Sequence, residues 1–396
     1  MDDILIRNVL LFGKTENVLI AGNRFKSLSA PADAPARHVI DGTGKALLPP
    51  FYNTHTHAAM SLLRGYADDM PLHKWLTEYI WPYENRMTSA DILEGSRIAI
   101  REMISTGTVF FSDMYFDIEE TIRAVDEGGL RAAIGVTFVD SHSKSQQVDK
   151  LNVLRQWSDP TGGRITLAVA PHAVYTVGTD LLVQCAEVAR SQNFKLHIHL
   201  SETRQEVENC IRDHGATPVR YLDKLGVLGP NVIAAHVVHV DEEEAAILAE
   251  RGVTISHCPC SNMKLASGIF PYKLLKEAGC RITLGTDGAA SNNNLDMREE
   301  MKFAALLAKV SSGDPEMMPA AEAFALATRN GAEAFGIDAG VIEAGKLADA
   351  LLIRLDDERM QPRHHLISNW VYAACAESID TVICDGKILM EEGEYV

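Results

Sequence analysis

Two histidines separated by one threonine, His55 and His57, stand in the segment FYNTHTHAAMSLLRG, which begins at Phe51. The preceding residues KALLPP are typical of an apolar strand that leads into a tight bend. Alternate residues of a strand point to the same face about 7 Å apart, so both imidazole rings can reach one point. Imidazole is the commonest protein ligand for metal ions, so the pair indicates a metal site, although two polar residues of a surface loop can share this spacing.

The segments between residues 45 and 288 alternate short apolar runs with amphipathic stretches. The predicted strands are 45–51, 108–114, 131–138, 165–172, 195–202, 231–239, 254–262 and 282–288. The stretches 91–107, 180–193 and 272–279 have helical spacing of apolar residues, and several end in glycine or asparagine. Eight such units over roughly 290 residues predict an α/β fold, a (β/α)₈ TIM-type barrel. A doubly wound sheet is the alternative, but no G-x-G-x-x-G motif follows the first strand.

Both ends of the chain have the alternation of sheet rather than helix. ILIRNVLLF and NVLIAGNRFKSL lie at the start, and ADALLIRL and TVICDGKILM near the end. Gly22-Asn23 and Asp385-Gly386 are predicted hairpin turns. We therefore expect the two ends to meet in one small β-sandwich domain. The predicted division is residues 1–49 with 342–396 for the small domain, and residues 50–341 for a metal-dependent barrel catalytic domain.

In a (β/α)₈ barrel the chemistry is carried out at the C-terminal ends of the strands. The titratable side chains at those ends are His55, His57, His172, His199, Glu202, His236 and Asp287. Each alone has an ordinary structural explanation, such as a buried core histidine, but together at one face they favour a metal site. Imidazoles and a carboxylate suit Zn²⁺, which lowers the pKa of its water from about 15.7 to roughly 7. Glu202, three residues after His199, is placed to move protons.

Five segments resemble the amidohydrolase superfamily, and within it the methylthioadenosine/S-adenosylhomocysteine deaminase family: HTHAAMSLLRG, HIHLSET, AAHVVHV, TLGTDGAASNNNLD and GKLADALLI. The similarity covers essentially the whole chain, and TLGTDGAASNNNLD is highly specific whereas HTH alone is not. The resemblance implies a zinc-dependent aminohydrolase that converts the adenine ring of an adenosine-type nucleoside to hypoxanthine and ammonia. Its substrates would include 5′-methylthioadenosine, adenosine, 5′-deoxyadenosine and S-adenosylhomocysteine.

The same resemblance implies roles for individual residues. One divalent metal per chain, best matched by Zn²⁺, would be held by His55, His57, His199 and Asp287. His236 would orient the water, Asp287 would take its proton, and Glu202 would carry protons to the purine ring nitrogen. Glu84 would bind the ribose hydroxyls, and His172 and Trp75 would line the purine pocket. Without the resemblance, Glu84 is simply a solvated carboxylate near a proline and Trp75 a buried indole.

Two positions depart from the family pattern. Pro50 stands where a glycine is usual, which changes the backbone rather than the chemistry. Family members that bind S-adenosylhomocysteine hold its carboxylate with arginines after the third barrel strand, where this chain has GVTFVDSHSKSQQVDKL. Lys144 or Lys150 offers a point charge there without the bidentate fork of arginine. This difference favours adenosines with small 5′ groups.

The composition of the chain limits its possible binding partners and its cellular compartment. The net charge of −17 over 396 residues argues against nucleic acid or an anionic membrane as the partner and suits a small-molecule nucleoside. Seven scattered cysteines form no disulfide pattern, the start MDDILIRN is unlike a signal peptide, and no apolar run reaches the length of a membrane span. We therefore expect a cytoplasmic protein. The oligomeric state is left open, a homo-oligomer included.

Two rival functions remain. One is a deaminase or chlorohydrolase of another aza-heterocycle, such as guanine, a pterin or a triazine, with the same metal site. Glu84 discriminates against it, because a free base has no ribose diol. The other is a purine-binding scaffold or sensor without turnover, which would need neither Glu202 nor Asp287 to carry protons.

Overall fold

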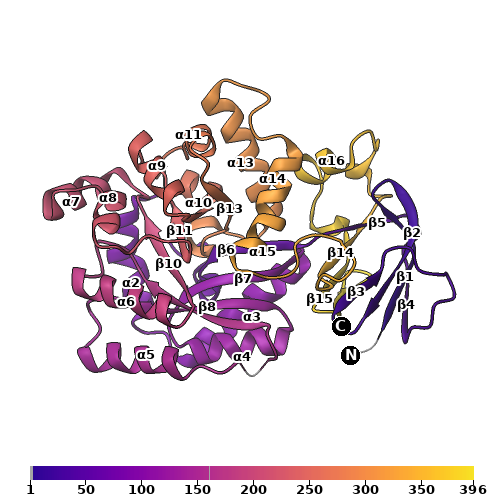
Figure 1. Ribbon diagram of the computed structural model, residues 1–396, viewed down its shortest axis with the longest axis horizontal. Helices are drawn as coiled ribbons and strands as arrows, with labels where there is room; N and C mark the ends of the chain where they lie inside the picture. The colour runs from indigo at the N-terminus through magenta and orange to yellow at the C-terminus, as the bar shows by residue number, and fades with distance from the viewer. Residues whose placement is uncertain (1–2, 160) are drawn as a thin grey trace.

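The computed structural model describes residues 3–159 and 161–396, which fold around two sheets. Figure 1 shows the helix-covered body on the left and the small sheet on the right. The larger body holds eight parallel strands in chain order that curl into a nearly closed barrel. The predicted fold class, a (β/α)₈ barrel with a separate sheet from both chain ends, is therefore confirmed.

The barrel strands are short and buried. They are β6 (Phe51–Thr56), β7 (Thr108–Tyr115), β8 (Arg131–Phe138), β9 (Ile165–Pro171), β10 (Lys195–Leu200), β11 (Val232–His236), β12 (Thr254–His257) and β13 (Arg281–Leu284). Strands β6, β7 and β8 are buried along their whole length, because side chains fill the barrel on one face and helices cover the other. Such two-sided burial explains the near-continuous apolar runs in the sequence.

The predicted first barrel strand, 45–51, was wrong in its bounds. Residues 45–48 form β5 of the small sheet, where they pair with β14, and the barrel strand begins only at Phe51. Pro49 and Pro50 separate the two strands, since proline cannot donate a ladder hydrogen bond. His55 therefore lies inside a strand rather than beyond its end. The predicted strand 254–262 is also too long, because residues 259–264 form a helix.

Helices and short turns connect the strands and cover the barrel. The α-helices around the barrel are α1 (Leu72–Lys74), α2 (Trp81–Glu84), α3 (Ser89–Ser105), α4 (Ile118–Gly128), α5 (Lys144–Gln156), α6 (Thr179–Ser191), α7 (Arg204–His214), α8 (Pro218–Lys224), α9 (Glu242–Glu250), α10 (Pro259–Lys264), α11 (Tyr272–Glu277), α12 (Ala289–Asn292), α13 (Met297–Ser312), α14 (Ala320–Ala327), α15 (Arg329–Ala334) and α16 (Leu366–Tyr372). The 3₁₀ turns are η1 (Ala58–Leu63), η3 (Glu358–Met360) and η4 (Ala376–Ser378), and η2 (Trp75–Ile80) is a π-helix. Capping boxes begin α3, α5 and α9.

The barrel is closed by residues just beyond β13. The amide of Asp287 donates to the carbonyl of His55 at 3.0 Å. The side chain of Asn53 donates to Thr286 Oγ1 at 2.7 Å and accepts from the Thr286 amide at 3.1 Å. Gly285 permits this approach, because a Cβ atom there would lie 2.9 Å from the backbone nitrogen of His55. The two segments that carry predicted metal ligands are thus adjacent.

The small sheet combines the first and last strands of the chain. Its strands are β1 (Ile4–Leu11), β2 (Lys14–Ala21), β3 (Arg24–Ser27), β4 (His38–Asp41), β5 (Lys45–Leu48), β14 (Ala350–Arg354), β15 (Ile379–Cys384), β16 (Lys387–Glu391) and β17 (Glu394–Tyr395). One edge of β1 pairs with β2, and the other pairs first with β4 and then with β5, so the sheet divides around a separate apolar core. The predicted hairpin turns lie between β2 and β3 and between β15 and β16.

A buried ionic network joins the small sheet to the barrel. Arg131 at the start of β8 contacts Asp349 at 3.0 Å and Asp385 at 2.6 Å, and the Tyr52 hydroxyl donates to Asp349 at 2.7 Å. All of these side chains are buried. The two parts of the chain therefore share polar as well as apolar contacts.

The domain bounds, residues 1–49 with 342–396 and residues 50–341, stay a prediction. Within 342–396, Trp370 of α16 stacks on Phe51 of the barrel with ring centroids 5.9 Å apart. The indole is fully buried and belongs to the main core. The C-terminal segment thus contributes to the barrel as well as to the small sheet.

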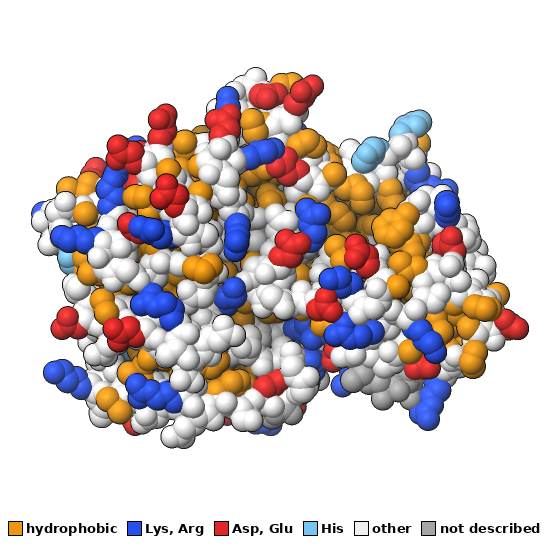
Figure 2. Space-filling model, in the orientation of Figure 1, with side chains coloured by type: hydrophobic (Ala, Val, Ile, Leu, Met, Phe, Trp, Pro, Cys, Tyr) orange, Lys and Arg blue, Asp and Glu red, His pale blue; other side chains and the backbone are white. Residues whose placement is uncertain are grey.

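Figure 2 shows acidic and basic side chains interspersed over one face, so on that face the excess negative charge is spread out. Among the described residues, no helix combines the length and the apolar character that a membrane crossing requires. All seven cysteines lie in the described part of the chain and are free thiols.

We predict that Arg131→Met lowers the free energy of unfolding by about 3 to 5 kcal/mol, because it leaves Asp349 and Asp385 buried without their cation. Urea denaturation followed by circular dichroism measures the change.

Arg123→Met is the matched control. Arg123 pairs with Glu127 on the exposed surface of α4, and such pairs contribute about 0 to 1 kcal/mol. Equal midpoints for the two variants would contradict a structural role for the network.

Candidate active site

A cavity of about 820 Å³ opens at the C-terminal ends of the barrel strands. It is lined by the predicted site residues His57, Trp75, Glu84, His172, His199, Glu202, His236 and Asp287. His55 is fully buried beside them. The structure therefore brings every sequence-predicted site residue to one place.

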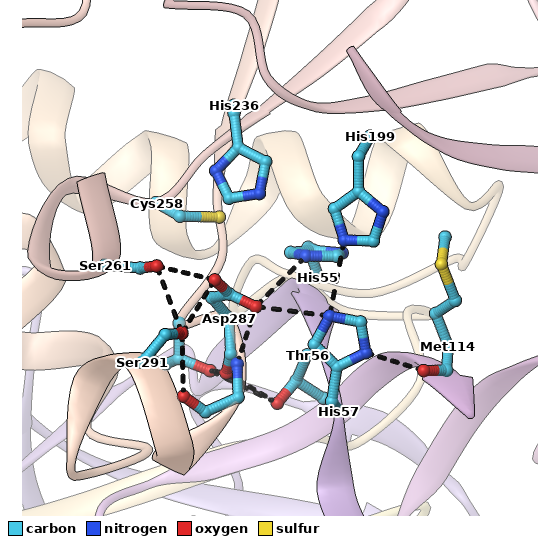
Figure 3. A network of polar contacts seen from close by, with 12 residues as sticks. His55, Thr56, His57, Met114, His199, His236, Cys258, Ser261, Asp287 and Ser291 are labelled. Carbon is cyan, nitrogen blue, oxygen red and sulfur yellow. Dashed lines mark hydrogen bonds and ion pairs between the residues drawn. The ribbon is translucent and has the colours of Figure 1, made fainter. Parts of the chain in front are cut away.

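Four side chains converge at the bottom of the cavity (Figure 3). Oδ1 of Asp287 lies 3.4 Å from Nε2 of His55 and 3.2 Å from Nε2 of His57. Nε2 of His199 lies 3.3 Å from Nε2 of His57. Ligand atoms about 3.3 Å apart are the separation expected around a tetrahedral ion with bonds of about 2.0 to 2.1 Å. The spacing thus fits a Zn²⁺-sized ion.

Hydrogen bonds on the far side of each ring aim the Nε2 atoms at this point. His57 Nδ1 lies 2.6 Å from the carbonyl of Met114, and His199 Nδ1 lies 2.8 Å from the carbonyl of His172. A carbonyl only accepts, so each Nδ1 carries the proton and each Nε2 has a free lone pair. Nε2 of His55 is a buried atom without a hydrogen-bond partner among the described residues. These are the properties of metal ligands.

His197, two residues before His199 on β10, lies one layer deeper in the barrel. Its Nε2 is 2.8 Å from Nδ1 of His55, and its Nδ1 is 3.1 Å from Oγ of Ser112. The ring therefore orients His55 and does not enter the cavity. Such partners of a ligating histidine fix its tautomer.

The carboxylate of Asp287 is held on both oxygens. Oδ2 accepts hydrogen bonds from Ser261 at 2.6 Å and from Ser291 at 2.8 Å, as Figure 3 shows. Oδ1 accepts from the amide of Gly288 at 2.7 Å and faces the histidines. The serines thus occupy one oxygen and leave the other for an ion.

Glu300, a fully buried residue of α13, ties together the segments that carry these serines. Its carboxylate accepts from the amide of Cys260, next to Ser261, at 3.1 Å. It also accepts from the side chain of Asn292, next to Ser291, at 2.6 Å. One buried carboxylate therefore positions both donors to Asp287.

Two further titratable side chains, Glu202 and His236, lie beside the four predicted metal ligands. Glu202 accepts a hydrogen bond from Ser267 at 2.9 Å, and its other oxygen lies 3.9 Å from Nε2 of His236. Nδ1 of His236 is 2.8 Å from Oδ1 of Asn262, so Nε2 faces the cavity. Burial raises the pKa of Glu202, while the charge of His236 opposes this shift. A carboxyl group with a raised pKa in a cavity is suited to both giving and accepting a proton.

The backbone leaves the strands in an unusual conformation at these positions. Ser201, His236 and Asp287, at the ends of β10, β11 and β13, have φ of 50°, 73° and 61°. Left-handed φ is uncommon outside glycine and is found at sites where the surrounding structure enforces it. At the end of β10, buried Glu206 accepts from the amides of Ser201 and Glu202 at 2.9 and 2.7 Å.

The outer wall of the cavity carries Glu84, His172 and Trp75. Glu84 ends α2, and burial raises its pKa while a hydrogen bond from Tyr115 opposes the rise. Burial lowers the pKa of His172 to about 3, so its ring is neutral. Trp75 is buried and donates to the carbonyl of Ala67 at 3.1 Å, so it is both a core indole and part of the wall.

Sequence reasoning missed the groups that support the site. They are Ser112, Glu206, Ser261, Asn262, Ser267, Ser291 and Glu300. Ser261 and Asn262 lie in the predicted strand 254–262, and Ser291 lies in TLGTDGAASNNNLD. These residues therefore belong to segments that the sequence had already indicated. The repetition of small polar residues after a strand was the available signal.

Comparison with known proteins agrees with this geometry. Residues 46–389 match the model of the amidohydrolase family. A 5′-deoxyadenosine deaminase of Methanothermobacter thermautotrophicus is 46% identical over 96% of this chain and 90% of its own. A 5-methylthioadenosine/S-adenosylhomocysteine deaminase of Pelotomaculum thermopropionicum is 47% identical over 96% of this chain and 89% of its own. The crystal structure of an adenosine deaminase from Xanthomonas campestris with bound zinc superposes with a TM-score of 0.92, at 33% identity, over 100% of this chain and 94% of that one.

We predict that replacing both Ser261 and Ser291 with alanine weakens metal affinity by about 10- to 100-fold, the usual effect of removing the partners of a ligand. The carboxylate of Asp287 would lose the two donors that fix its orientation. Competition with a chelator measures the affinity.

Ser61→Ala is the matched control. Its hydroxyl is also buried near the cavity but has no hydrogen-bond partner in the described part of the chain. Unchanged affinity in the double variant would show that Asp287 is oriented without these serines.

Proposed function

We infer that the chain, which belongs to the amidohydrolase family, is a hydrolytic deaminase of adenosine-type nucleosides. The observation that carries this conclusion is one cavity with three components. A cluster suited to a metal ion lies at its bottom, Glu202 and His236 lie beside the cluster, and Glu84 stands in its wall. The reaction replaces the amino group at C6 of adenine with oxygen and releases ammonia.

We propose that His55, His57, His199 and Asp287 hold one divalent ion per chain, and that the ion is Zn²⁺. The distances between their ligating atoms and the fixed Nε2 lone pairs support this assignment. Imidazole and carboxylate ligands are those that zinc accepts. When bound, such an ion lowers the pKa of water enough to form the nucleophile at neutral pH.

The residues around this cluster divide the proton transfers. Nε2 of His236 faces the cavity and orients the attacking water, and Asp287 accepts its proton. Glu202 delivers a proton to the ring nitrogen next to C6, which makes C6 more electrophilic. The C6–N bond then breaks as the amino group takes up the proton held by Asp287 and leaves as ammonia. The proton of the hydroxyl left on C6 returns to Glu202, which gives the C6 carbonyl of the product. Glu202 suits this transfer because burial raises its pKa, so its carboxylate takes up a proton more readily than it would in water.

Glu84 and His172 select the nucleoside. The carboxylate of Glu84 is placed in the wall to accept two hydrogen bonds from a ribose diol. His172 is neutral, its Nδ1 lies 2.9 Å from Oγ1 of Thr176, and its ring faces the purine. Trp75 closes the apolar side of the pocket. A free base such as guanine, or a triazine, would leave Glu84 unpaired, so we favour nucleosides over these alternatives.

The 5′ end of the cavity favours uncharged substituents. Of the residues 3–159 and 161–396, no arginine or lysine lines the cavity, whereas Asp117 and Asp140 do. A carboxylate that leaves water needs a paired cation or several donors. We therefore propose 5′-methylthioadenosine, adenosine and 5′-deoxyadenosine as better substrates than S-adenosylhomocysteine.

We also propose that the protein works in the reducing cytoplasm. Its seven free thiols include buried ones, such as Cys185 and Cys258, whose pKa values are raised by burial and which are therefore unreactive.

We predict that Glu202→Gln folds and keeps its metal but loses about 10²- to 10⁴-fold in kcat, because glutamine cannot carry the proton. Ammonia release and metal analysis on the same sample measure both quantities. Glu208→Gln, an exposed substitution on α7, is the control. Near-normal kcat in Glu202→Gln would exclude the proton-transfer role.

We predict a higher kcat/KM for 5′-methylthioadenosine or adenosine than for S-adenosylhomocysteine. Glu84→Ala should reduce kcat/KM for the nucleosides far more than for free adenine, since each charge-assisted hydrogen bond to the diol contributes about 1.5 to 3 kcal/mol. The decrease in absorbance on deamination follows each reaction.

Glu78→Ala is the control. Glu78 is exposed on η2, which leads directly into the helix of Glu84, and it does not line the cavity. A preference for S-adenosylhomocysteine would contradict the proposed exclusion of carboxylates.

A further inference from the structure

The part of the cavity wall left for the 5′ substituent comes from the end of β8, the loop that follows it and the first turn of α5. Thr137, Val139, Ser141, His142 and Gln146 line it. The purine is assigned to Glu202 and His236, and the ribose to Glu84, so this wall faces what the nucleoside carries at its 5′ carbon. The inference below rests on the proposed function.

Lys150, on α5, lies directly behind this wall. Its ammonium donates to the carbonyl of Thr137 at 2.6 Å and to Nδ1 of His142 at 3.1 Å, and it lies 5.9 Å from the centre of the Phe116 ring. Burial lowers the pKa of Lys150 to about 8, so the amine is still mainly protonated at neutral pH. Two of its N–H groups are thus used by protein acceptors, and Lys150 does not line the cavity, so it is not placed to hold a substrate carboxylate.

This contact fixes the tautomer of His142. An ammonium only donates, so Nδ1 of His142 must be the unprotonated acceptor and Nε2 must carry the proton. Burial and then the charge of Lys150 lower the pKa of His142 to about 4, which keeps the ring neutral. Hydrogen bonds to Val139 and from Gln147 also fix its backbone. His142 therefore presents one oriented N–H donor, which finds no hydrogen-bond partner among the described residues.

The surrounding charges decide which acceptor suits this donor. Asp117 and Asp140 line the same region, and the neutral ring of His142 offers a single hydrogen bond without a charge. An anionic group would meet two carboxylates, whereas an ether or hydroxyl oxygen would not be repelled. We propose that His142, held in its Nε2–H tautomer by Lys150, is a specificity-determining residue that donates to an uncharged oxygen on the 5′ substituent.

An isosteric pair of nucleosides tests the proposal. The 2-hydroxyethylthio and propylthio derivatives of 5′-deoxyadenosine differ only in that a hydroxyl group replaces the terminal methyl group. We expect kcat/KM to favour the hydroxyethylthio compound by about 5- to 10-fold in the wild-type protein, as one neutral hydrogen bond allows. In His142→Phe, which keeps the ring and removes the donor, this ratio should fall to about 1.

Lys150→Met separates the positioning role from the contact itself. Without the ammonium, both tautomers of His142 become accessible, so the ratio should fall between those of the wild type and His142→Phe. Nitrogen-15 NMR of the imidazole should show an Nε2–H tautomer in the wild type and a mixture in Lys150→Met. Lys144→Met, at the exposed start of the same helix, should keep the wild-type ratio and tautomer.

The outcomes separate this inference from the proposed function. If the wild type deaminates both nucleosides equally well, or if His142→Phe keeps the preference, the inference is wrong while the deaminase function stands. An Nδ1–H tautomer in the wild type would also overturn it. If neither nucleoside nor adenosine releases ammonia, the proposed function and the inference fall together.

Discussion

The structure of the site depends on holding four ligand atoms close together, three imidazole nitrogens and one carboxylate oxygen. Neighbouring ligand atoms are separated by 3.2–3.4 Å, on side chains that are buried or nearly so. Lone pairs at this spacing repel, and buried polar atoms without partners are strongly unfavourable. Each ligand is therefore fixed from behind. His55 is held by His197, His57 by Met114, His199 by His172, and Asp287 by two serines. The geometry of the site therefore depends on these hydrogen-bond partners as much as on the ligands themselves.

These supports also explain why the strand order matters. The carbonyl that holds His57 lies on β7, next to β6, and the carbonyl that holds His199 lies at the end of β9, next to β10. A ligand on one strand is thus oriented by the backbone of its neighbour. Side-chain substitution cannot easily remove such partners. By contrast, Asp287 depends on side chains from α10 and α12, which Glu300 holds in place.

The sequence predicted most of the barrel because its signals are local. Apolar runs, helical spacing and Gly or Asn stops are readable over ten residues, and titratable groups at strand ends stand out by type. The segment 45–51 was misread because periodicity cannot say which sheet an apolar run joins, and only the partner strand β14 decides that. The serines and Glu300 were missed because their roles come from contacts between distant segments. Serine is too common for its type alone to indicate them.

The closure of the barrel through the site has a consequence for how the protein forms. Asn53 and Thr286 bond across 233 residues of chain, and Asp287 reaches His55 at the same seam. Contacts between such distant residues carry a large loop-closure entropy and form slowly compared with local ones. A chain that has built only its first strands has His55 and His57 but lacks their carboxylate partner. Only the completed ring of strands carries the whole ligand set, so a loaded site marks a chain whose barrel has closed.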